Sequence, residues 1–334
     1  MAAMTKDRQA TQSRPLFDDL PLNPSDPPGS AWGLWDKDDE LGTLNLLTPE
    51  IIRSAKEEIR HGIVVPLSLP LDSPAVPMNP RRKALLHNVI EKGYANDDEI
   101  HLNTQASSHW DGLRHYPYQD RTEQSEYRYY SGAVQSDFVQ DGRIKPRLGI
   151  QGMAQRGVAG RGVLLDWRAY AQQHGIEYSP FSRHCVPLSE LQAVIASQGI
   201  ELRAGDILLI RTGWTQEYNA LSTKEKVDLA GRPERTFVGV EASKEMLAWH
   251  WTNQFAAVAS DTNAYEVWPP TRPCGVSCHE VFLSGWGMPI GELWDLERLA
   301  AECARLRRWT FFVTSSPLNL TGGVASPANA MAIL

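Results

Sequence analysis

The sequence predicts a mixed α/β protein whose strands and helices alternate irregularly. Short apolar runs of strand length, such as 162–166, 205–213 and 256–260, lie between segments that carry helix-start signals. The alternation is not regular enough for a simple doubly wound sheet, and the sequence has no internal repeat and no Gly-rich phosphate loop. With 334 residues, of which 42% are hydrophobic, the chain is long enough to bury a large core.

Composition and charge exclude several classes of protein. The formal net charge is -7, and no cluster of Lys and Arg resembles a nucleic-acid footprint. No apolar run approaches the length of a membrane span, and residues 1–14 lack the apolar region of a secretory signal. We therefore expect a cytoplasmic protein that binds neither nucleic acid nor membrane. Its four cysteines are interpreted as reduced thiols, namely Cys185, Cys274, Cys278 and Cys303.

The N-terminal part divides into an arm and the start of the folded body. Residues 1–30 are polar and Pro-rich, which predicts a flexible arm or a strap over a neighbour, followed by a single domain over 31–334. Thr48 and Pro49 supply a cap and a first helical residue for a helix to about Arg60. A strand is predicted at 63–69. Residues 70–99, rich in Pro, Asn and charge, form an excursion long enough to cover a site.

The later elements follow from the same signals. Ser189 and Gln192 form a capping-box pattern that opens a helix to about Ser197. His250 stands between two tryptophans and is interpreted as a packed residue, while Asp261 follows a strand and either supports a metal site or caps the next turn. The further predicted strands are 162–166, 205–213, 256–260 and 310–314, and the further helices are 167–174, 240–251 and 296–307.

One stretch, 100–115, carries the chemistry. Interpreted as an extended strand from Ile100 to Asp111, it places its odd-numbered side chains on one polar face: His101, Asn103, Gln105, Ser107, His109 and Asp111. Gly112 then lets the backbone turn, so that His115 returns over the end of the strand. An imidazole and a carboxylate on one face, with a second imidazole nearby, favour a divalent metal and a general base. The alternative is a solvent-facing strand edge. His101 would lie roughly 26 Å from His109 and is excluded unless the strand is broken.

This stretch resembles the cyclase family of metal-dependent hydrolases, which includes kynurenine formamidase and isatin hydrolase. The family signature is His-x-Gly-Thr-His-x-Asp-x-x-x-His, and the chain reads Gln105-Ala-Ser-Ser-His109-Trp-Asp111-Gly-Leu-Arg-His115. The second half matches, whereas Gln replaces the first His and Ser-Ser replaces Gly-Thr. Further matches occur in order at 161–166, 205–213, 260–261 and 279–292, so the resemblance covers about 32–330. It implies a β-barrel-like core of mixed strands surrounded by helices, and subunits that associate as a homodimer or higher homo-oligomer.

The resemblance also implies roles for individual residues. His109 and Asp111 match metal ligands, and His115 matches the catalytic acid/base. His279 and Glu292, about one residue further apart than in kynurenine formamidase, match the ligands of a second metal. Trp32 or Trp35 matches an aromatic wall of the substrate pocket.

Gln105 is the notable departure from the family pattern. Its amide oxygen would bind a hard cation but is a poorer donor to zinc than imidazole. The implied cofactor is a divalent ion, either zinc held by fewer strong ligands or a harder ion such as manganese.

Three functions are compatible with these residues. The leading hypothesis is a metal-dependent hydrolase or cyclase that acts on an amide, lactam or lactone bond of a small aromatic or cyclic molecule, with His115 moving the proton. A non-haem iron oxygenase would combine His109 and Asp111 with His250 or His279, which leaves His115 without a role. Gln105 also prompts a third hypothesis, a binding protein for small molecules on a decayed enzyme scaffold.

Overall fold

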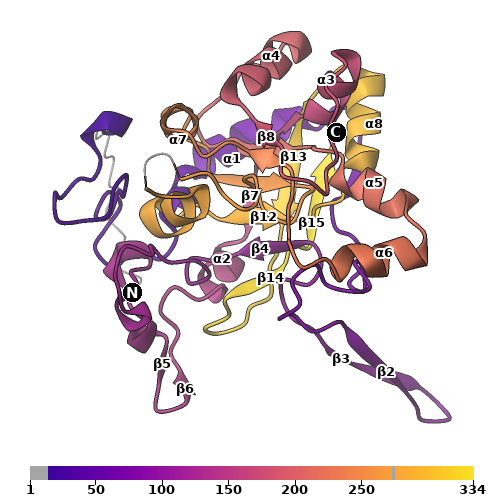
Figure 1. Cartoon of the computed structure of the whole chain (residues 1–334), viewed down its shortest axis with the longest axis horizontal. Coiled ribbons are helices and arrows are strands. Elements are labelled where there is room, and N and C mark those ends of the chain that lie inside the picture. The colour runs from indigo at the N-terminus through magenta and orange to yellow at the C-terminus, as the bar shows by residue number, and fades with distance from the viewer. Residues whose placement is uncertain (1–13, 273–274) are drawn as a thin grey trace, which may run out of the picture.

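A computed structural model describes residues 14–272 and 275–334. Its centre is a curled, half-barrel sheet of nine strands in the order β1-β15-β13-β7-β9-β11-β12-β4-β14, flanked by helices (Figure 1). The strands are β1 Val64–Pro66, β4 His109–Asp111, β7 Val158–Leu165, β9 Ile207–Ile210, β11 Ala257–Ser260, β12 Ile290–Glu292, β13 Thr310–Ser315, β14 Ala325–Pro327 and β15 Ala330–Ile333. The predicted class, a mixed barrel-like core surrounded by helices, is confirmed.

The middle of the sheet is parallel and both of its faces are buried. β7, β9, β11 and β12 run parallel, while the neighbours on either side pair antiparallel. Along β9, Leu208 and Ile210 belong to one apolar cluster, and Ile207 and Leu209 belong to another on the opposite face. Continuous apolar runs are therefore required here, because each alternate side chain has its own core to fill.

Four of the predicted helices begin within one residue of the expected start, and the helix predicted from 240 begins at 244. The helices at 151–156, 214–220 and 223–230 were not predicted. The helices are α1 Pro49–Ala55, α2 Gln151–Arg156, α3 Trp167–Gln173, α4 Leu188–Gln198, α5 Trp214–Ala220, α6 Thr223–Ala230, α7 Lys244–Thr252 and α8 Glu297–Leu306, with a π-helix at Glu280–Trp286. Thr48 caps α1 by accepting a hydrogen bond from Ile51 N, as predicted, although α1 ends at Ala55 and a 3₁₀ turn follows. The predicted capping box at Ser189 is wrong, because α4 already begins at Leu188 after Pro187.

The predicted single strand from Ile100 to Asp111 is also wrong. Residues up to His101 form β3 (Asn96–His101), which pairs with β2 (Leu86–Glu91) in a hairpin that projects from the body (Figure 1). The chain then turns, because the Asn103 side chain accepts a hydrogen bond from Gln105 N at 3.0 Å and Asn103 O accepts one from Ala106 N. His101 is exposed on the hairpin, and β4 contains only the three residues from His109 to Asp111. Two further pairs are short, β5 Val139–Gln140 with β6 Arg143–Ile144 and β8 Cys185–Val186 with β10 Gly239–Val240.

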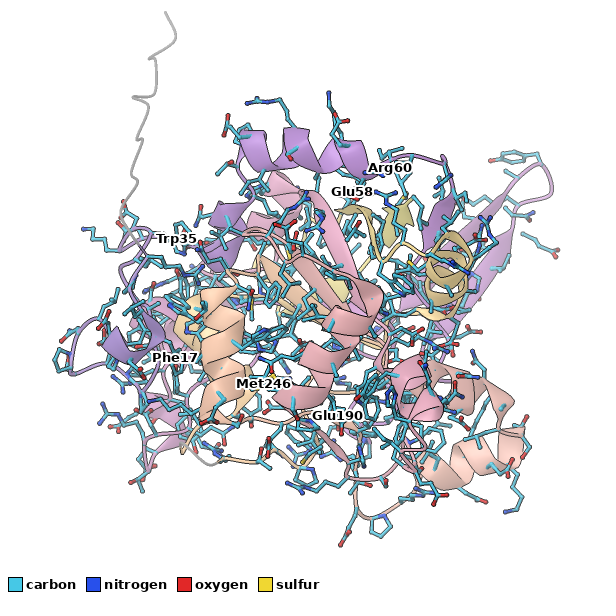
Figure 2. The ribbon with its side chains drawn as sticks, turned by 90° about the horizontal axis from the view of Figure 1, so that it is seen from above. Phe17, Trp35, Glu58, Arg60, Glu190 and Met246 are labelled. Carbon is cyan, nitrogen blue, oxygen red and sulfur yellow. The ribbon has the colours of Figure 1, made fainter. Side chains whose placement is uncertain are left out.

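The segment 14–30, which was expected to belong to a flexible arm, packs against the body. Phe17 makes an edge-to-face contact with Trp286, and Figure 2 shows it beside α7. Two indole groups bond to the backbone of the segment, Trp251 to Pro15 O and Trp286 to Gly29 O, both at 2.8 Å. Buried tryptophans require such acceptors, which fixes the path of the segment. The rest of the expected arm, residues 1–13, lies outside the described residues.

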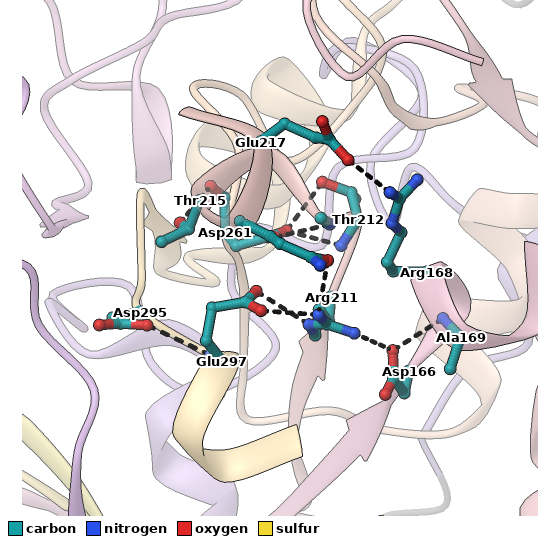
Figure 3. A network of polar contacts seen from close by, with 12 residues as sticks. Asp166, Arg168, Ala169, Arg211, Thr212, Thr215, Glu217, Asp261, Asp295 and Glu297 are labelled. Atoms are coloured by element: carbon teal, nitrogen blue, oxygen red, sulfur yellow. Dashed lines mark hydrogen bonds and ion pairs between the residues drawn. The ribbon is translucent and has the colours of Figure 1, made fainter. Parts of the chain in front are cut away.

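A polar network joins the ends of the central strands (Figure 3). Arg211 follows β9 and donates to Asp166 at 2.9 Å and to Glu297 at 2.6 Å. Asp261, after β11, accepts hydrogen bonds from Thr212 N and Gly213 N at 2.6 and 2.8 Å. Asp261 therefore caps the start of α5, which lies on the neighbouring strand's connection, and not the next turn along the chain, which the sequence suggested.

Two general expectations concern membrane helices and cysteines. In the part of the chain that the structure describes, no helix is long and apolar enough to span a bilayer. Cys185, Cys278 and Cys303 are free thiols, and Cys274 lies outside the described residues.

Candidate metal centre

The pairing of β4 with β12 creates a buried group of three potential ligands. The antiparallel register places His109 opposite Glu292, and Asp111 lies two residues after His109 on the same face. His109 Nε2 is 3.4 Å from Asp111 Oδ1 and 3.5 Å from Glu292 Oε2. One donor atom from each of the three residues lies within 4.8 Å of the others. The sheet therefore brings together residues that are far apart in the sequence.

The donor atoms in this group fit a divalent cation. His109 Nδ1 donates to Ser107 O at 2.7 Å, which turns Nε2 toward the two carboxylates. His109 Nε2 and Asp111 Oδ2 are buried, and neither has a hydrogen-bond partner among the described residues. Unpaired buried polar atoms are costly, at about 1–3 kcal/mol each. Imidazole nitrogen with carboxylate oxygens is a ligand set for zinc or manganese.

The electrostatics of the group also favour a cation. Burial alone would lower the pKa of His109, but Asp111 and Glu292 raise it to about 9. Burial would raise the pKa of Asp111, yet the imidazoles of His115 and His109 hold it well below its usual range. Asp111 is thus ionised and paired with positive charge, so a metal ion would compete with the proton on His109.

His115 and Gln105 both reach Asp111 from outside the strand. The chain turns after Gly112, whose carbonyl accepts from His115 N, and His115 Nε2 lies 3.7 Å from Asp111 Oδ1. Gln105 Nε2 donates to Asp111 Oδ1 at 2.5 Å and is 3.1 Å from His115 Nδ1. Gln105, expected as a ligand, here presents its NH₂ group, which has no lone pair for a metal. In this arrangement it orients Asp111 instead.

His279 borders the group rather than forming a separate one. Its Nε2 lies 3.0 Å from Glu292 Oε1, and its Nδ1 lies 2.8 Å from Glu266 Oε1. Glu266 is wholly buried and also accepts from Cys278 N and His279 N. Burial would lower the pKa of His279, but Glu266 and Glu292 raise it to about 10. Sequence reasoning missed Glu266, although an acidic residue inside the apolar run 264–268 was a usable signal.

A cavity of about 190 Å³ opens over the group. His115, His279 and Glu292 line it on the side of the potential ligands, and Tyr116, Phe237 and Trp268 supply aromatic surface. Its remaining wall consists of Met78, Asn79, Arg82, Arg235, Asn263 and Ala264. The excursion at 70–99 therefore reaches the cavity through Met78, Asn79 and Arg82, since its hairpin projects away (Figure 1).

Trp32 and Trp35, expected to wall the substrate pocket, do not line this cavity. The Trp32 indole donates to Ser284 O at 2.6 Å, and its ring packs edge-to-face on Tyr118. Figure 2 shows Trp35 toward the rim of the molecule. The aromatic walls come instead from Tyr116, which directly follows His115, and from the later segment that contains Phe237 and Trp268.

The arrangement does not form the facial triad of an iron oxygenase, which needs a second histidine beside His109 and Asp111. His250 lies 2.8 Å from both Met246 O and Tyr265 Oη, so its two ring nitrogens are occupied elsewhere. His279 is held between two carboxylates. The third potential ligand is Glu292.

The protein is thus a mixed α/β protein with a potential metal site. The site consists of a buried His-Asp-Glu group beneath a cavity with aromatic walls. The chain belongs to the Cyclase family, whose model, described as "Putative cyclase", matches residues 52–267. This match includes His109, Asp111 and His115, and it ends before His279 and Glu292. A search of curated proteins gives no match.

Solved structures share the fold along most of the chain. A structure described as a novel cyclase is 28% identical, with a TM-score of 0.78, and the alignment covers 91% of this chain and 97% of that one. An isatin hydrolase A from Ralstonia solanacearum is 17% identical, with a TM-score of 0.51 and coverage of 85% and 97%. An isatin hydrolase A from Labrenzia aggregata, bound to benzyl benzoate, is 13% identical, with a TM-score of 0.53 and coverage of 83% and 94%.

Proposed function

We propose that the protein is a metal-dependent hydrolase or cyclase that acts on an amide, lactam or lactone bond of a small aromatic or cyclic molecule. The observation that carries this proposal is the buried group of His109, Asp111 and Glu292, with two unpartnered donor atoms among the described residues, beneath an aromatic cavity. Proteins of the same fold are named isatin hydrolase, and we extend hydrolase activity to this chain as part of the proposal.

The proposed ligands are His109, Asp111 and Glu292, which would hold zinc or manganese. When bound, such an ion polarises a substrate carbonyl and makes water more acidic. The two carboxylates with one imidazole are a harder ligand set than the three histidines of many zinc enzymes, which supports manganese as well as zinc.

His115 is the proposed acid/base. Its ring lines the cavity, its side chain is 21% exposed, and its Nε2 lies near Asp111, so it is accessible to substrate beside the ligands. It would accept a proton from water and return it to the leaving nitrogen or oxygen. Tyr116 and Trp268, whose rings pack around His279, would flank the ring of the substrate. Glu266 holds His279 in place at the start of the π-helix.

We also propose that the chain is cytoplasmic and forms a homodimer or higher homo-oligomer. The buried thiols of Cys278 and Cys303 support a reducing compartment. The projecting β2–β3 hairpin supports association, because Leu86, Val89, Tyr94 and Ile100 are exposed on it. Light scattering after size exclusion would give a mass above the 37.3 kDa of one chain.

The activity is tested by loading the protein with zinc or manganese and offering a panel of aryl amides, lactams and lactones in ¹⁸O-labelled water. We expect cleavage that stops on chelation and that places one ¹⁸O atom in the new carboxylate. Metal-loaded protein that binds such molecules and returns them intact would contradict the proposal and favour a binding protein. Turnover that consumes oxygen and 2-oxoglutarate with Fe(II) would favour an oxygenase.

A further inference from the structure

We propose that the cavity selects a single-ring substrate that carries a carboxylate, held by the guanidinium groups of Arg82 and Arg235. This inference rests on the proposed function for the position of the site, and it adds the chemical class of the substrate. The carboxylate in question is a second group on the ring, apart from the bond that is cut.

The cavity is lined by two arginines, although the protein is acidic. Glu292 is the one carboxylate among the described residues that line the cavity, and it belongs to the potential ligand group. Arg82 and Arg235 face the same space. Because the chain as a whole has a formal net charge of -7, two arginines that line one cavity do not reflect a generally basic surface.

Both guanidinium groups retain unused donors. Arg82 Nη1 donates to Gln105 O at 2.7 Å, and no acid lies within ion-pair distance of Arg82 or Arg235 among residues 14–272 and 275–334. By contrast, Arg161 and Arg211, which are buried elsewhere, are bonded to carboxylates. A guanidinium presents five N–H donors in a planar fork that fits a carboxylate.

Arg82 is also fixed close to the proposed chemistry. The Gln105 carbonyl holds its guanidinium, and the Gln105 side chain contacts Asp111 and His115. Gln105 is therefore the one residue that links Arg82, where the substrate carboxylate would bind, to the acid/base His115. This short path would fix the ring relative to the bond that is cut.

The rest of the cavity fits the ring that bears the carboxylate. Tyr116, Phe237 and Trp268 supply flat apolar surface, and the buried Asn263 Nδ2 has no acceptor among the described residues. A cavity of about 150 Å³ is enough to hold benzene, so the present cavity of about 190 Å³ accommodates one substituted ring. The arginines and this amide offer donors, which a carboxylate or carbonyl would satisfy.

The test compares two matched probes, 3-acetamidobenzoate and its uncharged methyl ester, by calorimetry on the metal-loaded protein. We expect the acid to bind at least about tenfold more tightly than the ester, and Arg82→Gln and Arg235→Gln each to lower that ratio by about tenfold, the scale of one charge-assisted hydrogen bond. Arg81→Gln is the matched control, because Arg81 is exposed and does not line the cavity. Arg235→Gln also breaks no ion pair within the part of the chain that the structure describes.

Equal binding of acid and ester, an unchanged ratio in both cavity variants, or binding of neither probe would overturn the inference. The inference would also be overturned if the preference for the acid persisted in both arginine variants and was lost on removal of the metal. The ion, and not the arginines, would then hold the carboxylate. The readout needs no turnover. An arginine-dependent preference without hydrolysis would therefore refute only the proposed function, and hydrolysis without that preference would refute only this inference.

Discussion

At the scale of single residues, the two oxygens of the Asp111 carboxylate have different surroundings. Asp111 Oδ1 accepts a hydrogen bond from Gln105 Nε2 at 2.5 Å. The same oxygen lies 3.4 Å from His109 Nε2 and 3.7 Å from His115 Nε2. Asp111 Oδ2 has no partner among the described residues. One oxygen thus fixes the orientation of the carboxylate, and the other is left for a cation.

Gln105 is predicted to matter through this orientation. Gln105→Ala removes the donor to Asp111 and should weaken zinc affinity by about 10–100-fold, the usual cost of losing such a supporting contact. Gln105→His should retain or tighten binding, because imidazole has a similar reach and is the better donor to zinc. Competitive titration with a zinc-sensitive dye measures both variants. Unchanged affinity in Gln105→Ala would show that the contact does not support the metal.

His115 is predicted to act on the proton rather than on the metal. His115→Ala should leave metal content nearly intact while lowering turnover by about 10²–10⁴-fold, the scale for loss of a positioned acid/base. Metal content and rate are measured on the same sample. Joint loss of metal and activity would instead make His115 a ligand.

At the scale of elements, the network around Arg211 holds the end of β9 against α8. Arg211→Met leaves Asp166 and Glu297 without their cation; their side chains are 7% and 27% exposed. We expect the free energy of unfolding to fall by about 3–5 kcal/mol, the usual cost of breaking a buried pair. Arg305→Met, which breaks an exposed pair with Glu302, should cost under about 1 kcal/mol in urea titrations. Equal losses would show that the network does not stabilise the fold.

Helix α7 is predicted to carry a pH dependence through His250. Burial lowers the pKa of His250 to about 4, against about 6.5 in the unfolded chain. The folded state therefore resists protonation of His250. The contribution of neutral His250 to the free energy of unfolding is fully present above the unfolded pKa of about 6.5, and it is lost as the pH falls toward the folded pKa of about 4. This residue alone should cost about 2 kcal/mol between pH 7 and pH 5. Unfolding free energies of the wild type should fall more than those of His250→Gln, and parallel profiles would contradict this.

Elements with local signals were predictable, and those set by distant contacts were not. The Thr48 cap depends on neighbouring residues, and the apolar runs of β7, β9 and β11 reflect burial on both faces of these strands. The break before β4 depends on the Asn103 side chain, which an alternating pattern does not reveal. The short strands β14 and β15 were missed because three or four residues carry too little pattern.

At the scale of the whole molecule, the order of the strands in the sheet determines the site. β4 pairs with β12 although the two strands are far apart in the sequence, and their register sets His109 opposite Glu292. The π-helix begins directly after His279 and precedes β12, and the His279 imidazole lies 3.0 Å from the Glu292 carboxylate. The potential metal site is therefore a property of the complete fold, because no single segment of the chain contains all of its donors.

The sequence identified part of this site. His109, Asp111 and His115 share one short motif, and the resemblance added Glu292 and His279. Glu266, Arg82 and Arg235 were not found, because loops without periodicity carry them to the cavity. The resemblance implied Trp32 or Trp35 as an aromatic wall, but neither lines the cavity, because which tryptophan reaches it depends on the path of the folded chain.

The central claim is that His109, Asp111 and Glu292 hold a divalent metal ion. Its most direct test is the metal content of purified, metal-loaded protein after dialysis, measured by inductively coupled plasma mass spectrometry. We expect about one divalent ion per chain in the wild type and almost none in His109→Gln, Asp111→Asn or Glu292→Gln. His87→Gln is the matched control, because His87 forms an exposed pair with Asp98 on the projecting hairpin and should leave the metal content unchanged. Full metal content in all three site variants would contradict the account.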